Sequence, residues 1–199
     1  MLRRADPKGR KRRGDDRYAA EGSKTWEQTV LSEKRDLLRH FLAALAYRTQ
    51  KAVRGAPPEF AEFAMGNQVR TPKELVRHMT SVLGYARTFF VGGSYRPEPL
   101  ESIEAEIGRF HSMLEDLSNH LADGDPFLED LTEERLLQGP FSDAMTHAGQ
   151  LAMLRRLHGD PVPPENFIVA DVRSSNLGPV QANPSSPDAE WPEAPKLSK

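Results

Sequence analysis

Histidine and carboxylate side chains are the residues of this sequence whose types and spacing could do metal chemistry. The chain has six histidines and no cysteine, which excludes a thiolate nucleophile of its own and Cys-ligated zinc or iron–sulfur sites. Residues four apart share a helix face, so Asp143 and His147 form a candidate pair of ligands. The spacing alone does not separate metal ligands from surface histidines, because an acidic residue also precedes His40, His78 and His120 by four positions.

The position of each histidine relative to an apolar stripe separates candidate ligands from surface histidines better than the spacing does. At helical periodicity, His78 and His147 fall on the flanks of apolar stripes, whereas His40 and His120 fall on polar faces. A hydrogen-bonded histidine on the flank of a core is commoner than a metal ligand. The residues by themselves therefore leave both roles open for His78 and His147.

Four segments with helical apolar periodicity would have to position these side chains. The first starts near Thr25, which forms a capping-box pair with Gln28; the second starts at Thr71, with Pro72 at the first helical position and Glu74 three residues after the cap. The expected helices cover residues 25–55, 71–92, 100–123 and 141–159. No segment alternates as a strand would. Helices with a single apolar stripe can bury those stripes only against one another, which predicts an all-α fold, a four-helix bundle.

The remaining segments indicate a loop and two tails around a domain at residues 23–180. The long connection between the first two helices carries Phe60, Phe63 and Met65, which we expect to anchor it across one end of the bundle. Residues 1–22 form a basic tail and residues 181–199 a proline-rich tail, and neither has a periodic apolar pattern, so both are expected to be disordered or extended.

Charge and hydropathy argue against a nucleic-acid-binding protein and against a membrane or secreted protein. Eight Lys or Arg lie in the first 17 residues, and the rest of the chain is acidic, so nucleic-acid binding is not expected. No apolar run approaches the length of a membrane span, and the basic start lacks the apolar core of a signal peptide. These features predict a cytoplasmic protein that is not membrane-bound.

The fourth expected helix and the residues after it resemble the C-terminal signature of the DinB superfamily. The matching motifs are GPFSD at 139–143, THAGQL at 146–151, LRRLHG at 154–159 and PPENF at 163–167. The resemblance extends over roughly residues 25–180. Proteins of this superfamily are metal-binding four-helix bundles, and the resemblance implies that His147 and His78, within TPKELVRHM at 71–79, are metal ligands.

One position departs from the commonest pattern of the superfamily. A third histidine usually lies four residues before the last one, where this chain has Asp143. Related bundles such as the thiol-dependent maleylpyruvate isomerases have a glutamate there, so His78, Asp143 and His147 remain a complete ligand set. Because Asp is shorter than Glu, Asp143 reaches a metal only if its helix approaches closely. Otherwise Asp143 would orient His147 from outside the coordination sphere, or the site would stay empty.

The resemblance also implies a function. Two histidines and one carboxylate leave coordination positions open, and they suit zinc, nickel, iron or manganese as divalent ions. We expect a metal-dependent enzyme for a small molecule, a thiol-dependent transferase or isomerase or a hydrolase, with a low-molecular-weight thiol as a candidate cosubstrate. The alternative is a noncatalytic, metal-binding or stress-associated homodimer. A closed, fully coordinated site without a pocket would favour this alternative. By helix phase, Gln150 and Tyr85 either line the pocket or are ordinary flank residues.

Overall fold

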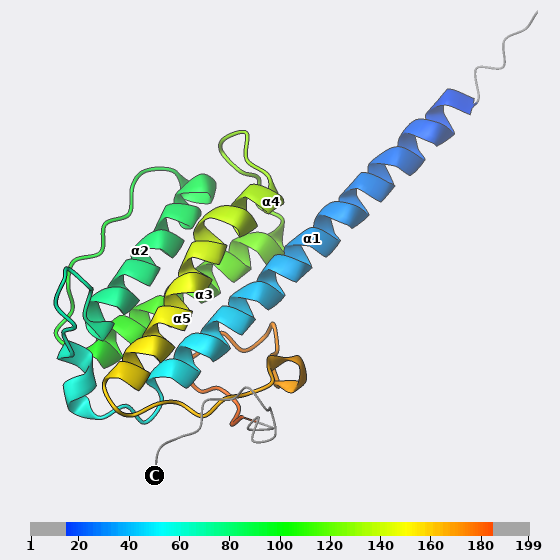
Figure 1. Cartoon of the computed structure of the whole chain (residues 1–199). Coiled ribbons are helices and arrows are strands. Elements are labelled where there is room, and N and C mark those ends of the chain that lie inside the picture. Colours follow the sequence, from blue (N-terminus) through cyan, green and yellow to red (C-terminus); the bar gives the residue numbers. More distant parts are fainter. Residues whose placement is uncertain (1–14, 185–199) are drawn as a thin grey trace, which may run out of the picture. The chain divides into compact units, whose positions relative to one another are not determined.

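The computed structural model of the protein is all-α (Figure 1). It describes residues 15–184, and the side chains of residue 26 and of residues 28–184. Its helices are α1 (Asp15–Val53), α2 (Pro72–Val91), α3 (Ile103–Asp123), α4 (Glu133–Leu136) and α5 (Ser142–Leu157). Two 3-10 turns, η1 (Pro58–Glu62) and η3 (Phe167–Val169), and a π-helical turn, η2 (Leu137–Phe141), complete the regular structure. Residues 15–184 contain no β-strand, as predicted.

The chain divides into two compact units, one ending at Lys34 and the other beginning at Arg35. The described part of the first unit is the N-terminal part of α1. The core and the candidate site both belong to the second unit, which includes the part of α1 from Arg35 onwards.

Helix α2 begins at the residues that the sequence predicts. The Thr71 hydroxyl accepts a hydrogen bond from the backbone N–H of Glu74, and the Glu74 carboxylate accepts one from the backbone N–H of Thr71. Gly92 ends the helix with a φ of 76°, which a residue with a side chain rarely adopts. Both predicted boundaries of this helix are therefore confirmed.

Helix α1 begins at Asp15 rather than near Thr25, so the predicted start is wrong. The residues between these positions include alanine, glutamate, lysine and arginine, all strong helix formers, and the two aspartates at the start favour the positive end of the helix dipole. The predicted basic tail is thus helical from Asp15, and its residues 1–14 lie outside the described residues. The same holds for residues 185–199 of the predicted C-terminal tail.

The fourth predicted helix also has an earlier start, because α4 and η2 precede α5 without a break. Thr132 caps α4 by accepting a hydrogen bond from the backbone N–H of Arg135. The Gly139–Pro140 pair, taken from sequence as a helix boundary, is instead a kink: Gly139 has non-helical dihedral angles, φ −90° and ψ −107°. Proline disrupts regular helix bonding, and here the Ser142 hydroxyl donates to the Leu137 carbonyl at 2.7 Å.

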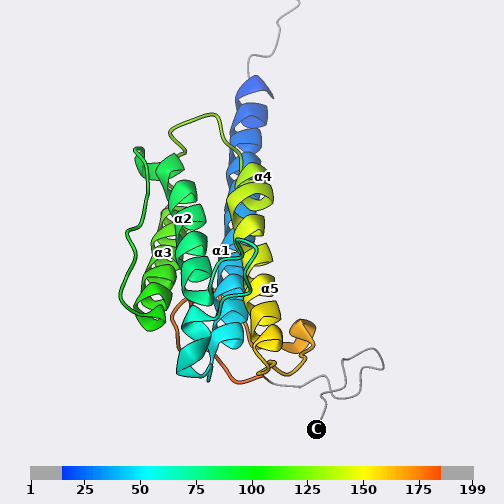
Figure 2. The same ribbon diagram turned by 60° about the vertical axis from the view of Figure 1, so that its left-hand side comes forward.

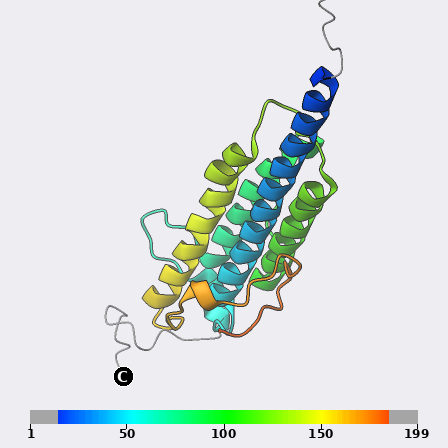
Figure 3. The same ribbon diagram turned by 90° about the vertical axis from the view of Figure 1, so that its right-hand side faces the viewer.

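Helices α2, α3 and α5 run alongside one another and share one hydrophobic core with the part of α1 from Arg35 (Figures 2 and 3). The largest fully buried apolar side chains come from all five helices and from the turns between them: Leu42, Leu45, Phe60, Met79, Leu83, Phe110, Leu114, Leu117, Leu136, Phe141 and Leu151. Each helix thus buries its apolar stripe against the others, which is the arrangement that the periodicity predicts.

The connection between α1 and α2 is anchored by two of its three predicted residues. Phe60 is fully buried and Phe63 packs against the core, and both rings contact His158 edge-on. Met65 is 40% exposed, so the prediction that it anchors the loop is wrong. Two aromatic rings already fill the end of the core, which leaves Met65 on the surface.

Buried polar contacts attach the connecting segments to the helices. The Arg35 guanidinium donates to Glu133 at 3.0 Å and to the Asp125 carbonyl at 2.8 Å, which fixes the start of α4. Glu165, in the segment after α5, accepts from the Tyr47 hydroxyl at 2.5 Å and pairs with Lys51 at 2.7 Å. Within residues 15–184, no helix combines the length and the apolar character needed to cross a bilayer.

We predict opposite effects for two glycine substitutions, one buried on α2 and one exposed on α3. A Cβ at Gly84 in α2 would overlap the ring of Tyr95, whereas a Cβ at Gly108 in α3 would meet nothing within 4 Å. Gly84→Ala should lower the free energy of unfolding by about 1–3 kcal/mol, because overpacking displaces the ring. Gly108→Ala should raise it by about 0.4–1 kcal/mol, because alanine restricts the unfolded chain and favours helix. Urea unfolding measures both, and equal stabilities would contradict the Tyr95 contact.

Candidate metal centre

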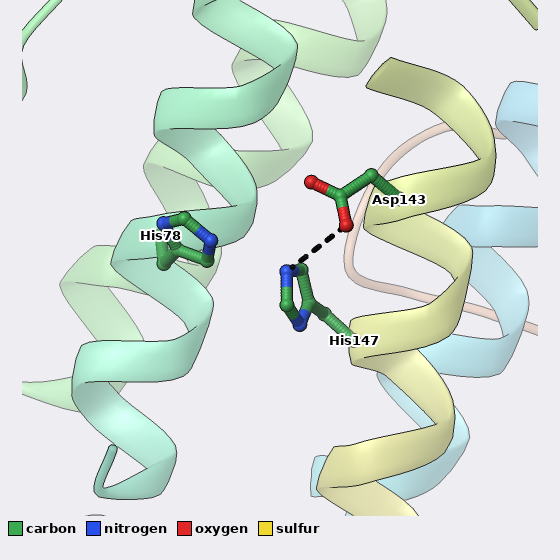
Figure 4. A group of neighbouring side chains, drawn as sticks. All are labelled: His78, Asp143 and His147. Atoms are coloured by element: carbon green, nitrogen blue, oxygen red, sulfur yellow. Dashed lines mark ion pairs between the residues drawn. The ribbon is translucent and has the colours of Figure 1, made fainter. Parts of the chain in front are cut away.

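Helices α2 and α5 bring His78, Asp143 and His147 together. Each of the three offers one ligand atom, and these atoms all lie within 4.8 Å of one another. Figure 4 shows His78 on α2 facing Asp143 and His147 on α5, across the space between the two helices. The rings of His78 and His147 lie with their centroids 4.7 Å apart and their planes at 69°. The three residues predicted as ligands therefore form one group that could hold a metal ion.

The packing of each helix places its ligand at the edge of the core. On α2, Leu75 and Met79 are buried, and His78 beside them is half-buried. On α5, Ala144 and Leu151 are fully buried, and His147, between them along the helix, is 9% exposed. Both histidines thus occupy the flank positions that helical periodicity indicates, where a side chain can reach between neighbouring helices.

The kink before α5 precedes Asp143 by a few residues. Phe141, the last residue of η2, is fully buried and stacks on Phe41 with ring centroids 6.3 Å apart. This contact holds the start of α5 against α1, and the four-residue spacing on α5 puts Asp143 one turn before His147 on the same side. The Asp143 Oδ1 atom lies 3.5 Å from His147 Nε2. Asp143 therefore comes as close as a shared ligand site requires, despite its short side chain.

The hydrogen bonds of His147 leave one ring nitrogen available as a ligand. Its Nδ1 lies 2.8 Å from the Gln150 Oε1 atom, which can only accept, so Nδ1 carries the proton. Its Nε2 is buried and has no hydrogen-bond partner among the described residues. A metal-binding histidine ordinarily donates its second ring N–H in this way, which fixes the tautomer and the ring orientation. Gln150 is thus a positioning residue for His147.

The distance between Asp143 and His147 fits a shared divalent ion. At 3.5 Å it is too long for a good hydrogen bond. Ligand bonds of about 2.0–2.2 Å in a tetrahedral site place neighbouring ligand atoms roughly 3.3–3.6 Å apart. The orphaned Nε2 atom and the carboxylate oxygen are therefore spaced as two neighbouring ligands would be.

The surroundings of His78 favour its neutral form. Burial lowers the pKa of His78, and the positive charge of Arg70 and the neighbouring His147 lower it further, while Asp143 acts in the opposite direction. A neutral imidazole is the form that binds a metal. His78 is thus held ready to act as a ligand at neutral pH.

The other four histidines lie elsewhere and have their own surroundings. His40 is exposed, as predicted. His120 was predicted on a polar face, and this is wrong: it is partly buried, stacks on Phe90 and lies 2.6 Å from an Asp125 oxygen. Phe90, on helix α2, covers this ring, and helix phase within α3 does not report a contact with another helix.

Two further histidines, for which helix phase predicts no role, are packed against other residues rather than available as ligands. His111 is buried and lies 2.6 Å from the Leu177 carbonyl, so its Nδ1 donates to the segment after α5. Burial lowers the pKa of His111. His158 is held between Phe60 and Phe63. A backbone carbonyl far along the chain holds His111, and two aromatic rings of the α1–α2 connection hold His158, so contacts distant in sequence place both rings.

Three pockets open beside the candidate centre. One of about 710 Å³ is lined by Asp143 and Tyr85, and one of about 390 Å³ is lined by Gln150. A third, of about 250 Å³, is lined by His78. Tyr85 and Gln150, predicted by helix phase either to line the site pocket or to be ordinary flank residues, line two different pockets: Tyr85 shares one with Asp143, whereas the pocket of Gln150 contains none of the three ligands. The arginines of the third pocket were not identified from sequence, because Arg96 lies in a loop with no periodic signal.

No protein-family model matches the chain, and no curated protein and no solved structure matches it either.

We predict that removal of any one ligand side chain abolishes tight metal binding. Asp143→Asn is the most informative variant, because the side chain is 53% exposed and its loss leaves the core intact. Asp143→Asn and His147→Ala should weaken zinc binding more than about 100-fold. Gln150→Ala should weaken it by about 10- to 100-fold, the usual effect of losing a partner that orients a ligand. Calorimetric titration of zinc into tag-free, metal-stripped protein measures these affinities.

His40→Ala is the matched control for this series. His40 also follows an acidic residue, Asp36, by four positions, but it is exposed and remote from the three ligands. The His40→Ala variant should bind zinc as tightly as the wild type does. Equal loss of zinc in His40→Ala and His147→Ala would show that the three residues are not the site. His120 is less suitable as a control, because its ring packs on Phe90.

We further predict that Arg70→Gln raises the pKa of His78 in the metal-free protein. The positive charge of Arg70 disfavours the protonated, positively charged imidazole, so its removal favours protonation. The rise should be roughly a few tenths of a pH unit, because an exposed charge is screened by solvent and salt. The pKa should still stay below the ordinary value, since burial is the larger cause. An NMR titration of the imidazole checks both, and an unchanged or lower pKa would contradict it.

Proposed function

We propose that the protein is a divalent-metal-binding four-helix bundle of the DinB type and that it is a metal-dependent enzyme for a small molecule. The observation that carries this proposal is the convergence of His78, Asp143 and His147 between two helices, with one pocket lined by Asp143 and another lined by His78. The donor set of two imidazoles and one carboxylate suits zinc, nickel, iron or manganese.

Pockets beside the ligands support an enzyme rather than a structural metal site. Structural zinc sites are closed by four protein ligands, whereas catalytic sites have three and keep a position open. Only three candidate ligands converge here among the described residues. The pocket lined by Asp143 and Tyr85 gives a small molecule access to the same place.

Four side chains have distinct roles in this proposal. His78 and His147 bind through neutral imidazoles, and Asp143 adds one negative charge that offsets the charge of the ion. Gln150 holds the His147 ring in the tautomer that presents Nε2. A bound divalent ion would supply Lewis acidity, by which the pKa of a water or a thiol in the open position is lowered. Because the chain has no cysteine, a reacting thiol would come from a low-molecular-weight cosubstrate.

Cobalt substitution tests this function against the noncatalytic alternative. We predict that the Co(II) protein binds dithiothreitol and gives a thiolate-to-cobalt charge-transfer band, because a coordination position is open to an external ligand. Gln150→Ala should retain the band at saturating cobalt, and Asp143→Asn should lose tight cobalt binding.

Two outcomes would contradict the proposal. A cobalt protein whose spectrum is unaffected by dithiothreitol, azide and cyanide has a closed site, which would indicate a noncatalytic, stress-associated or homodimeric metal-binding bundle instead. Failure of the wild type to bind any of the four metals would remove the metal-dependent function altogether.

A further inference from the structure

Arg70, Arg77 and Arg96 surround the pocket that contains His78. None of the three donates a side-chain hydrogen bond or forms an ion pair with a described residue. The carboxylate that lines the same pocket belongs to Glu74, which already accepts a hydrogen bond from the backbone N–H of Thr71. Three guanidinium groups thus share the pocket with one carboxylate, so the pocket carries net positive charge that Glu74 offsets only in part.

Arg70 also lines the neighbouring pocket of about 390 Å³. The walls of that pocket are mostly apolar and are formed by side chains that solvent otherwise reaches: Met65, Val69, Met153 and Leu157 are between 40% and 56% exposed. Its volume lies within the range of small-molecule sites. Gln150, which lines the same pocket, holds the ring of His147. An apolar pocket and a cationic pocket thus meet at Arg70; the cationic one contains the candidate ligand His78, and the apolar one contains Gln150, the partner of His147.

The backbone of the segment before Arg70 is unusual. Gly66, Asn67 and Gln68 have φ values of 75°, 50° and 62°, so two residues with side chains follow the glycine in the left-handed region. Such conformations cost free energy and are concentrated at ligand-binding sites. Here they shape the loop that presents Met65, Val69 and Arg70 to the apolar pocket.

We infer that the substrate of the proposed enzyme is a small organic acid with an apolar body, whose carboxylate binds Arg70 while its body fills the pocket formed by Met65, Val69, Met153 and Leu157. That this molecule is a substrate rests on the proposed function, but the binding site itself consists of protein groups that need no metal. An arginine can donate two parallel hydrogen bonds to the two oxygens of a carboxylate. A neutral amide has one oxygen and cannot accept this pair of bonds.

Phenylacetate and phenylacetamide form a matched pair of probes, because they share an aromatic body and differ in charge. In calorimetric titrations of the metal-free, full-length protein, phenylacetate should bind at least about tenfold more tightly than phenylacetamide. Arg70→Gln should abolish this preference. Arg135→Gln should retain the preference, because Arg135 is exposed, forms no ion pair with a described residue and lines neither pocket.

Methionine methyl groups report where the probe binds. The chain has six methionines, of which Met65 and Met153 line the apolar pocket. In protein labelled with 13C at the methionine methyl groups, phenylacetate should shift the signals of these two and leave the buried Met79 unchanged. Met65→Leu and Met153→Leu assign the two signals.

Several results would overturn the inference. These are equal affinity for the acid and the amide, an unchanged preference in Arg70→Gln, or absence of shifts at Met65 and Met153. Inorganic phosphate that binds as tightly as phenylacetate would show that the apolar pocket contributes nothing. Binding of phenylacetate only to the zinc-loaded protein, unaffected by Arg70→Gln, would show that the ion rather than the arginine holds the carboxylate. Because the first titration uses metal-free protein, its failure is distinct from a failure of the protein to bind metal.

Discussion

The contact between helices α2 and α5 is the interaction on which the candidate site depends. His78 belongs to one helix and Asp143 and His147 to the other, so no ligand group exists unless these two helices lie side by side. Burial of Met79 on α2 and of Leu151 on α5 in one core enforces that arrangement. The hydrophobic effect thus determines where the polar ligands meet, although the ligands contribute nothing to it.

Irregular backbone lies at both sides of this contact. The π-helical turn and the non-helical Gly139 precede Asp143, and π-helical turns are frequent at functional sites. The left-handed Asn67 and Gln68 precede Arg70 and helix α2. Regular helices supply the rigid positions of the imidazoles, while the two irregular segments shape the pockets beside them.

Much of the fold and of the candidate site could be predicted from local patterns. The Thr71–Glu74 capping box predicts the start of α2 because both hydrogen bonds join residues three apart. Helical phase predicts His78 and His147 on core flanks, because it depends only on the geometry of one helix. The same phase is wrong for His120, whose burial comes from Phe90 on another helix. The kink at Gly139 was missed because a Gly–Pro pair ordinarily ends or begins a helix.

The sequence by itself determined the helices, their apolar stripes and the types of side chain that could bind a metal. These properties follow from interactions between neighbours along the chain, which the order of residues specifies directly. Only the tertiary structure decided which histidines meet, that Asp143 is close enough to share a site with His147, and that Arg70 joins a cationic pocket to an apolar one. These depend on which helix faces pack together and on the paths of the loops, and such contacts arise from the burial of the whole core rather than from any one segment.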